Sequence, residues 1–161
     1  MLRTPLRPSP WLSDASGGEV FLKLETLQPT HSYKVRGATN AVLKLVDAGR
    51  RDPIVTASAG NHGRALAFAA RAAGLALTVY VPEQAPRTKL DAIRALGAEL
   101  RPCRDYDEAE RRAKEHGARG LGTFVSPYAH PDGIAGAGTV GLEIREEMTG
   151  SETIVASIGG G

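Results

Sequence analysis

Short apolar runs alternate with helical stretches along most of this chain, and that alternation limits the folds it can adopt. Most of the runs are rich in β-branched residues, as strands are, and glycine or proline marks the turns between elements. The predicted strands are residues 54–57, 77–81, 98–101, 123–125 and 153–158, and the predicted helices are residues 64–73, 87–96, 105–116 and 132–148. This order predicts an α/β fold, in which a parallel sheet carries helices on both faces.

The first 52 residues follow a different pattern. Residues 1–18 are rich in proline, serine and glycine and show no period, so we expect an irregular entry segment there. Residues 19–25 alternate apolar and charged side chains, as a half-buried strand does. From Val35 onward apolar residues recur at helical spacing until residues 47–49 end the helix.

The composition is that of a globular protein and excludes several classes of partner. The chain has 161 residues, which suit one domain or two small lobes, and its 20 basic and 18 acidic side chains give a net charge of +2. This balance argues against nucleic acid or an anionic membrane as a partner, and no apolar run approaches the ~20 residues of a membrane span. A single cysteine, Cys103, excludes an internal disulfide. We expect no metal site and a cytoplasmic location.

The chain stops on Gly159, Gly160 and Gly161, directly after a strand-like run. Domains rarely end on a glycine-rich turn whose next element is missing. We therefore expect the chain to be a fragment, or a truncated product, of a longer protein.

Lys34 lies in a loop just before a helical stretch, within the sequence SYKVRGA of residues 32–38. A lysine that attacks an aldehyde must be neutral, and a helix N-terminus together with a nearby cation such as Arg36 favours the neutral amine. Ser32 fits the N-cap of the helix. Taken alone, Lys34 would be an ordinary surface group, since lysines are mostly exposed.

The sequence SAGNHG, residues 58–63, joins a predicted strand to an alanine-rich helix. Successive backbone N–H groups at such a turn form a concave anion site, and Asn61 offers an amide donor. Taken one by one, Ser58 or Asn61 could be a helix cap and His62 a surface histidine. The glycines at 159–161 could hold a phosphate in the same way. Both segments follow strands, at the edge where parallel sheets bind ligands.

Other titratable side chains show no functional pattern. His116 and His130 lack metal-ligand spacing, so we expect ordinary surface or loop groups. Glu143 is expected on the solvated face of a helix.

Together these segments resemble the active-site pieces of the fold type II pyridoxal-phosphate-dependent enzymes, which are tryptophan synthase β-like, and within them the threonine/serine dehydratase group. Residues 32–38 are similar to the Ser-[Phe/Tyr]-Lys-x-Arg-Gly-Ala pattern of that group. Residues 24–30, residues 81–86 with Lys89, and residues 127–139 resemble further segments in the same order. The similarity runs through nearly the whole chain.

The resemblance implies two lobes. Residues 1–52 would begin a large cofactor-binding domain, residues 53–131 would form a small α/β domain, and residues 132–161 would return into the large domain, which is incomplete in this chain.

The resemblance also implies roles for the candidate residues. Lys34 would bond covalently to pyridoxal 5'-phosphate and serve as the catalytic base, and Asn61 would hydrogen-bond the ring hydroxyl oxygen. Gly159, Gly160 and Gly161 would bind the phosphate. The residues implied to bind the substrate carboxylate are Ser58, Ala59, Gly60, Asn61 and His62. The implied reaction converts L-threonine and/or L-serine to a 2-oxo acid and ammonia, in a protein expected to be a homo-oligomer when full length.

Two departures separate related activities. Cysteine and threonine synthases of this fold usually carry Lys-Asp-Arg, so Val35 favours the dehydratase branch. Serine racemases of the family place a hydroxyl where this chain has Ala59, and alanine supplies no acid or base. The dehydratase is preferred, and an amino-acid racemase of the same fold or a catalytically inactive, partner-binding paralogue are the alternatives.

Overall fold

A four-stranded parallel sheet is the centre of the fold in the computed structural model, which describes residues 1–150 and 153–156. Its strands are β3 (Ile54–Ala57), β4 (Leu77–Pro82), β5 (Glu99–Cys103) and β6 (Thr123–Phe124), in the order β5-β4-β3-β6. In this register Val55 lies opposite Thr78 on one side and Phe124 on the other. The predicted α/β fold with a parallel sheet is confirmed.

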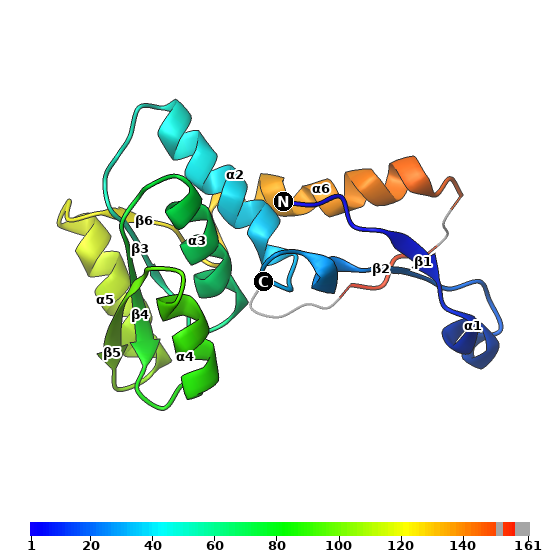
Figure 1. Ribbon diagram of the computed structural model, residues 1–161, viewed down its shortest axis with the longest axis horizontal. Coiled ribbons are helices and arrows are strands. Elements are labelled where there is room, and N and C mark those ends of the chain that lie inside the picture. The colour runs from blue at the N-terminus through cyan, green and yellow to red at the C-terminus, as the bar shows by residue number, and fades with distance from the viewer. Residues whose placement is uncertain (151–152, 157–161) are drawn as a thin grey trace.

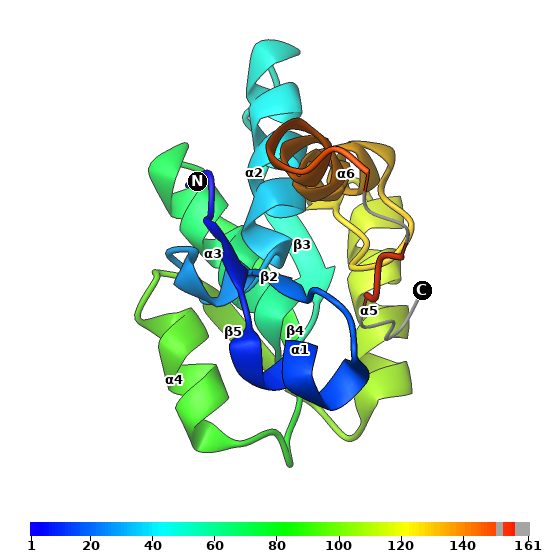
Figure 2. The same ribbon diagram turned by 90° about the vertical axis from the view of Figure 1, so that its right-hand side faces the viewer.

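Helices cover both faces of this sheet (Figure 2). On one face lie α3 (Asn61–Ala72) and α4 (Arg87–Arg94), with α2 (Lys34–Asp47) packed against α3, and on the other lies α5 (Tyr106–Ala118). Neighbouring residues of β3 pack on opposite faces of the sheet, because side chains alternate along a strand. Ile54 joins the core beneath α3 and Val55 the core beneath α5, and both are fully buried.

The direction of the chain across the sheet reverses once. From β3 the chain moves outward through β4 to β5, and then crosses back through α5 to place β6 on the other side of β3. The carboxyl ends of β3 and β6 therefore diverge at a topological switch point, which is where open α/β sheets form ligand crevices.

A second group of elements extends away from the sheet (Figure 1). It contains β1 (Leu6–Pro8), α1 (Pro10–Ser16), β2 (Phe21–Lys23), the 3-10 turn η1 (Glu25–Leu27) and α6 (Pro131–Glu147). β1 and β2 pair in antiparallel fashion, with Arg7 opposite Leu22. The prediction of an irregular segment over residues 1–18 is therefore wrong, because a strand that gains its partner from residues 21–23 leaves no periodic pattern of its own.

The prediction of a strand at residues 153–158 is also wrong for the part of that range that the structure describes. Residues 153–156 carry no strand, and residues 157 and 158 lie outside the described part of the chain. A β-branched run indicates a strand only if another strand pairs with it.

Helices α2 and α6 approach each other closely because glycines lie between them. A side chain on Gly37 would collide with the carbonyl oxygen of Gly133, and one on Gly136 would lie 2.6 Å from the carbonyl oxygen of Arg36. The Asn40 amide donates to the Asp132 carbonyl at 2.8 Å across the same contact. This packing joins α6 to the helix that begins with Lys34.

A buried ion cluster holds the beginning of α2. The Arg36 side chain is fully buried, and its guanidinium donates to both carboxylate oxygens of Glu25 (2.7 and 2.8 Å) and of Glu143 (2.6 and 2.9 Å). Lys23 adds a second cation, 2.9 Å from Glu143. Hydrogen bonding to Arg36 lowers the pKa of Glu143 to about 2. The cluster connects η1, β2, α2 and α6.

Two expectations are corrected by this cluster. Glu143 is not on a solvated helix face, because its side chain is only 15% exposed and is paired with two cations. Arg36 is not a free cation beside Lys34, because two carboxylates balance its charge.

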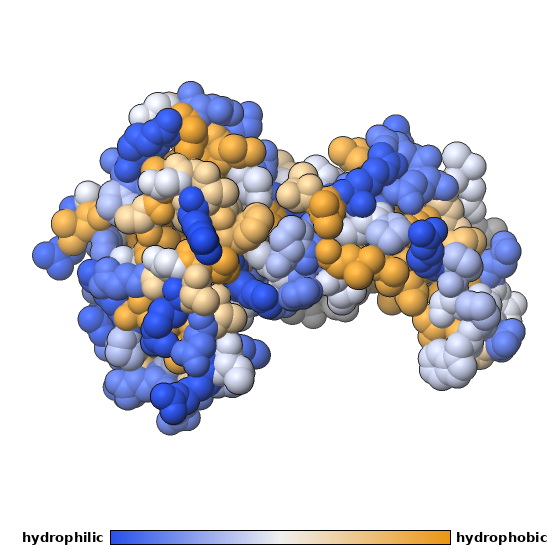
Figure 3. All heavy atoms as spheres, viewed as in Figure 1, coloured by the Kyte–Doolittle hydropathy of each residue, from blue (hydrophilic) through white to orange (hydrophobic). Residues whose placement is uncertain are grey.

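Large apolar side chains remain exposed around the second group of elements (Figure 3). Trp11 of α1, Phe21 and Leu22 of β2, and Leu142 of α6 are among them. Part of the surface around α1, β2 and α6 is thus apolar and uncovered by the described residues. No helix in the described ranges combines the length and apolar character needed to cross a bilayer.

Arg36→Met should lower the free energy of unfolding by about 3–5 kcal/mol, because it leaves buried carboxylates without their main partner. Urea unfolding followed by circular dichroism measures the loss. Arg94→Met is the matched control, since Arg94 pairs with Asp91 in an exposed position and its loss should cost at most about 1 kcal/mol. Equal losses in the two variants would show that the buried cluster does not stabilise the fold.

Candidate active site

An open hollow of about 470 Å³ lies at the carboxyl end of the parallel sheet. All four strands contribute to it through the residues that follow them: 58–62 after β3, 82–89 at and after β4, Tyr106 after β5, and Pro127 with Tyr128 after β6. Lys34 lines the edge of the hollow on the side of α2. Its volume falls in the range of ~300–1,000 Å³ that is typical of small-molecule sites.

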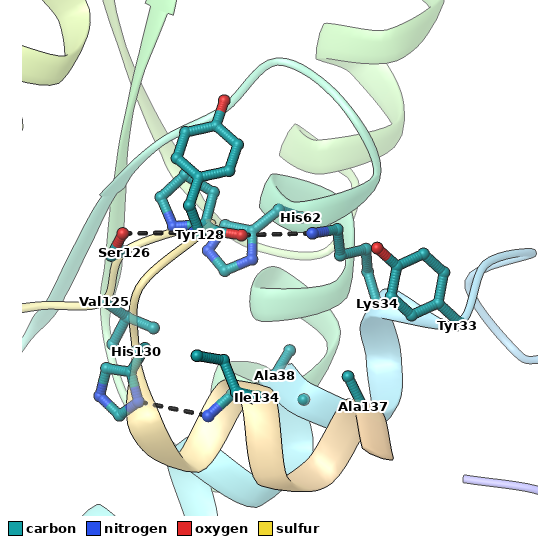
Figure 4. A pocket seen from close by; sticks show the side chains of 13 residues that line it. Tyr33, Lys34, Ala38, His62, Val125, Ser126, Tyr128, His130, Ile134 and Ala137 are labelled. Atoms are coloured by element: carbon teal, nitrogen blue, oxygen red, sulfur yellow. Dashed lines mark hydrogen bonds between the residues drawn. The ribbon is translucent and has the colours of Figure 1, made fainter. Parts of the chain in front are cut away.

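Lys34 is the first residue of α2, and its side chain reaches across to the loop after β6 (Figure 4). Its Nζ donates to the carbonyl oxygen of Pro127 at 3.2 Å and lies 5.3 Å from the centre of the Tyr33 ring. The Lys34 backbone N–H donates to Ser32 Oγ at 3.3 Å, so Ser32 does support the helix start, although Tyr33 holds the N-cap position. The amine is half-buried and positioned at the edge of the hollow.

The turn after β3 leads directly into α3, which begins at Asn61, three residues earlier than the sequence pattern predicts. The Gly60 N–H donates to Ser58 Oγ at 3.2 Å, and Gly60 has open space where a side chain would stand. Asn61 is exposed to the hollow. The positive end of the α3 dipole therefore faces the hollow, an arrangement that favours an anionic group.

His62 is buried, which excludes the alternative of a surface histidine. Among the described residues, nothing bonds its Nε2, which is shielded from solvent. Burial lowers the pKa of the imidazole to about 4, and the Lys34 charge adds to the effect. His62 is therefore neutral at physiological pH.

A second hollow of about 330 Å³ shares Lys34 and His62 with the first (Figure 4). Ile134 and Ala137 of α6 line it, together with His130. His130 is not a plain surface group: its Nδ1 accepts from the Gly133 N–H at 3.4 Å and caps α6. The Lys34 amine and the His62 ring therefore lie between the two hollows.

The structure brings together six of the nine residues that the sequence marked as a site. Lys34 and the five residues Ser58, Ala59, Gly60, Asn61 and His62 line one hollow. Gly159, Gly160 and Gly161 lie outside the described residues, so their predicted role stays a prediction. Sequence reasoning missed the contacts of Pro127 and Tyr128 with the site, although their position after β6 marked them as candidates.

The buried state of His62 predicts a pH-dependent stability. The folded-state pKa of about 4 lies below the usual histidine value of 6.5, so the unfolded chain binds the proton first, and stability falls as pH decreases from about 6.5 to about 4. Replacing His62 by Asn should remove up to about 1.4 kcal/mol per pH unit of this slope. Urea unfolding at a series of pH values measures it.

The control is His31→Asn, at an exposed position whose φ of 55° asparagine tolerates. This variant should keep the slope of the parent protein. Equal slopes in the parent and in His62→Asn between pH 4 and 6.5 would contradict the burial of a neutral imidazole.

Comparisons with known proteins agree with this geometry. A protein related to this chain is an L-threonine ammonia-lyase of Thermotoga maritima, 41% identical over 160 residues that cover 99% of this chain and 40% of that protein. Another is a beta-hydroxyaspartate dehydratase of Paracoccus denitrificans, 40% identical over 99% of this chain and 51% of its own length. A solved pyridoxal 5'-phosphate-dependent aspartate racemase superimposes with a TM-score of 0.85 at 35% identity, over 91% of this chain and 46% of that one.

The chain thus spans about half the length of the relatives it matches. The family model described as "Pyridoxal-phosphate dependent enzyme" matches residues 1–161, which is the whole of it. The parallel sheet, the lysine at its carboxyl edge and this match lead to one conclusion: the chain belongs to the family of pyridoxal-phosphate-dependent enzymes.

Proposed function

We propose that the chain carries the lysine-bearing part of a dehydratase that converts L-threonine and/or L-serine to a 2-oxo acid and ammonia. The observation that carries the proposal is the meeting of the Lys34 side chain, the amino-terminal end of α3 and the His62 ring in one hollow. The relatives named as a threonine ammonia-lyase and a β-hydroxyaspartate dehydratase support β-hydroxy amino acids as the substrate class.

The described residues fit pyridoxal phosphate as a cofactor. A primary amine reaches the hollow beside a buried imidazole nitrogen that has no partner among the described residues, and such a polar atom is costly unless a ligand bonds it. The bare backbone at Gly60 leaves room for a ligand to approach the N–H groups of the turn. We propose that Lys34 holds the cofactor, that Asn61 donates to its ring oxygen, and that the glycines at 159–161 bind its phosphate.

Each side chain then has a chemical task. When bound, the cofactor supplies a ring that withdraws electrons from the amino acid and so acidifies its Cα–H bond. Lys34 Nζ accepts that proton, and the Pro127 carbonyl 3.2 Å away keeps the amine at the edge of the hollow. The N–H groups of the turn at 58–61 bind and orient the substrate carboxylate. The β-hydroxyl leaves as water together with the proton taken from Cα, and the released enamine then reacts with a second water to give the 2-oxo acid and ammonia.

The neutral state of His62 suits this arrangement. A neutral imidazole has one ring nitrogen that donates a hydrogen bond and one that accepts. We propose that it contacts the substrate side of the site.

The remaining proposals concern the whole protein. We propose a large cofactor-binding domain begun by residues 1–52 and rejoined by residues 132–161, with residues 53–131 as the small domain. We also propose that the full-length protein is a homo-oligomer, that it is located in the cytoplasm, and that it acts on a small amino acid.

A racemase is the second candidate, and the likeness to an aspartate racemase favours it. Racemisation needs an acid or base on both sides of Cα. Ala59 lines the hollow with a methyl group that can supply neither, which supports the dehydratase. Chiral analysis of L-serine after incubation separates the two: accumulation of D-serine would favour the racemase, and accumulation of a 2-oxo acid the dehydratase.

Incubation with pyridoxal phosphate, reduction with borohydride and peptide mapping should place a covalent label on Lys34. Lys34→Ala should lose both the label and any 2-oxo acid formation, because the substitution removes the amine proposed to hold the cofactor and to accept the Cα proton. Lys44→Ala is the control, since Lys44 is exposed near the far end of the same helix.

A label on Lys89, which also lines the hollow, or no label at all, would contradict the assignment of Lys34. A label on Lys34 without any 2-oxo acid, even with excess cofactor, would instead favour the catalytically inactive reading of this chain.

A further inference from the structure

A separate polar hollow of about 210 Å³ lies between α5 and the strands β4 and β5. Three guanidinium groups line it: Arg101 from β5, Arg112 from α5, and Arg119 just after α5. It lies toward the amino ends of the strands, because α5 runs back along the sheet from Tyr106 at their carboxyl ends. The hollow therefore belongs to neither of the spaces around Lys34.

The Tyr80 side chain lines the hollow and contacts two of these arginines and His116. The Arg101 and Arg112 guanidinium carbons lie 5.9 and 5.4 Å from the centre of its ring, which is within the range of cation–π attraction. The Tyr80 hydroxyl accepts from Arg101 at 3.3 Å and bonds His116 Nδ1 at 3.0 Å. Two cations that would repel each other are thus held beside one aromatic ring.

The charges around the hollow are not balanced by its own residues. Glu115 is the single carboxylate among the lining residues, and it is bound to Arg111 at 2.6 Å. Arg101 is paired with Glu99 through its Nε, which leaves its Nη2 without a bond among the described residues. Arg119 makes no ion pair with any residue that the structure describes. Arg112 has only a long contact of 3.9 Å with Glu108, so Arg119 and the unused N–H donors of Arg101 are left to bind an anion in the hollow.

We propose that this hollow is a binding site for a phosphate group. Guanidinium forks match phosphate oxygens and can bond them in pairs, and two of the forks are already held in place by Tyr80. The volume is below that of a typical drug-sized pocket and suits a compact anion. The same α5 that gives Tyr106 to the Lys34 hollow gives its last two turns to this site, so occupancy here can stiffen a helix that reaches both.

The test is binding of inorganic phosphate, and of glycerol 3-phosphate as a phosphomonoester, to protein that has been reduced with borohydride in the presence of pyridoxal phosphate and then dialysed free of unbound cofactor. The reduction fixes the cofactor covalently at its own site, and dialysis leaves the arginine hollow empty. Isothermal titration calorimetry at constant ionic strength measures the affinity, and the Nε–H resonances of ¹⁵N-labelled arginines locate the site. We expect saturable binding, with shifts at Arg101 and Arg112. Tighter binding of the ester would identify a phosphorylated metabolite as the ligand, and equal or weaker binding would identify free phosphate.

Arg112→Gln should weaken binding by about tenfold or more, because each charge-assisted hydrogen bond lost is worth at least that factor. Arg119→Gln, at a fully exposed position that carries no part of the core, should weaken it as well. The matched control is Arg94→Gln, an exposed arginine on α4 over the opposite face of the sheet. No saturable binding of either probe, or equal affinity in the parent and both hollow variants, would overturn the proposal.

Discussion

The buried guanidinium of Arg36 is the constraint on which the arrangement of the other parts depends. A charge without solvent contact is tolerated only where its hydrogen bonds are complete, and Arg36 completes them with the paired oxygens of Glu25 and Glu143. These partners come from η1 and α6, which lie 11 and 107 residues away along the chain. The cluster therefore fixes the first turn of α2, two residues from the amine of Lys34.

The sheet supplies the second half of the site. Because the chain turns back after β5 and places β6 on the other side of β3, the loops after β3 and β6 lead in different directions and leave room between them. Lys34 enters this room from α2 and contacts the loop after β6, while α3 presents its amino-terminal end and His62 from the other side. A site with an amine, an anion-binding turn and a neutral imidazole results from two independent pieces of architecture, the switch point and the ion cluster.

Local patterns were sufficient where an element is determined by its own residues. The β-branched run of β3 and the Asp-x-x-Glu signal that begins α5 are examples: Asp105 accepts from the Glu108 N–H at 2.8 Å, as a capping box requires. Lys34 and the turn at 58–62 could be recognised because each stands at a strand or helix boundary. Patterns failed where order comes from a distant partner, as for β1, which pairs with β2, and for Glu143, whose burial depends on Arg36. The burial of His62 depends likewise on α2 and on the loop after β6, which no local pattern reveals.

Native-state hydrogen exchange of the first turn of α2 tests the central claim most directly. If the Arg36 cluster anchors that turn, the amides of Ala38 and Thr39 should exchange only through global unfolding, with the same protection as Val55 in β3. In Arg36→Met these two amides should lose protection ahead of Val55. Exchange of Ala38 and Thr39 at the rate of a fraying helix end in the parent protein, or unchanged relative protection in the variant, would contradict the account.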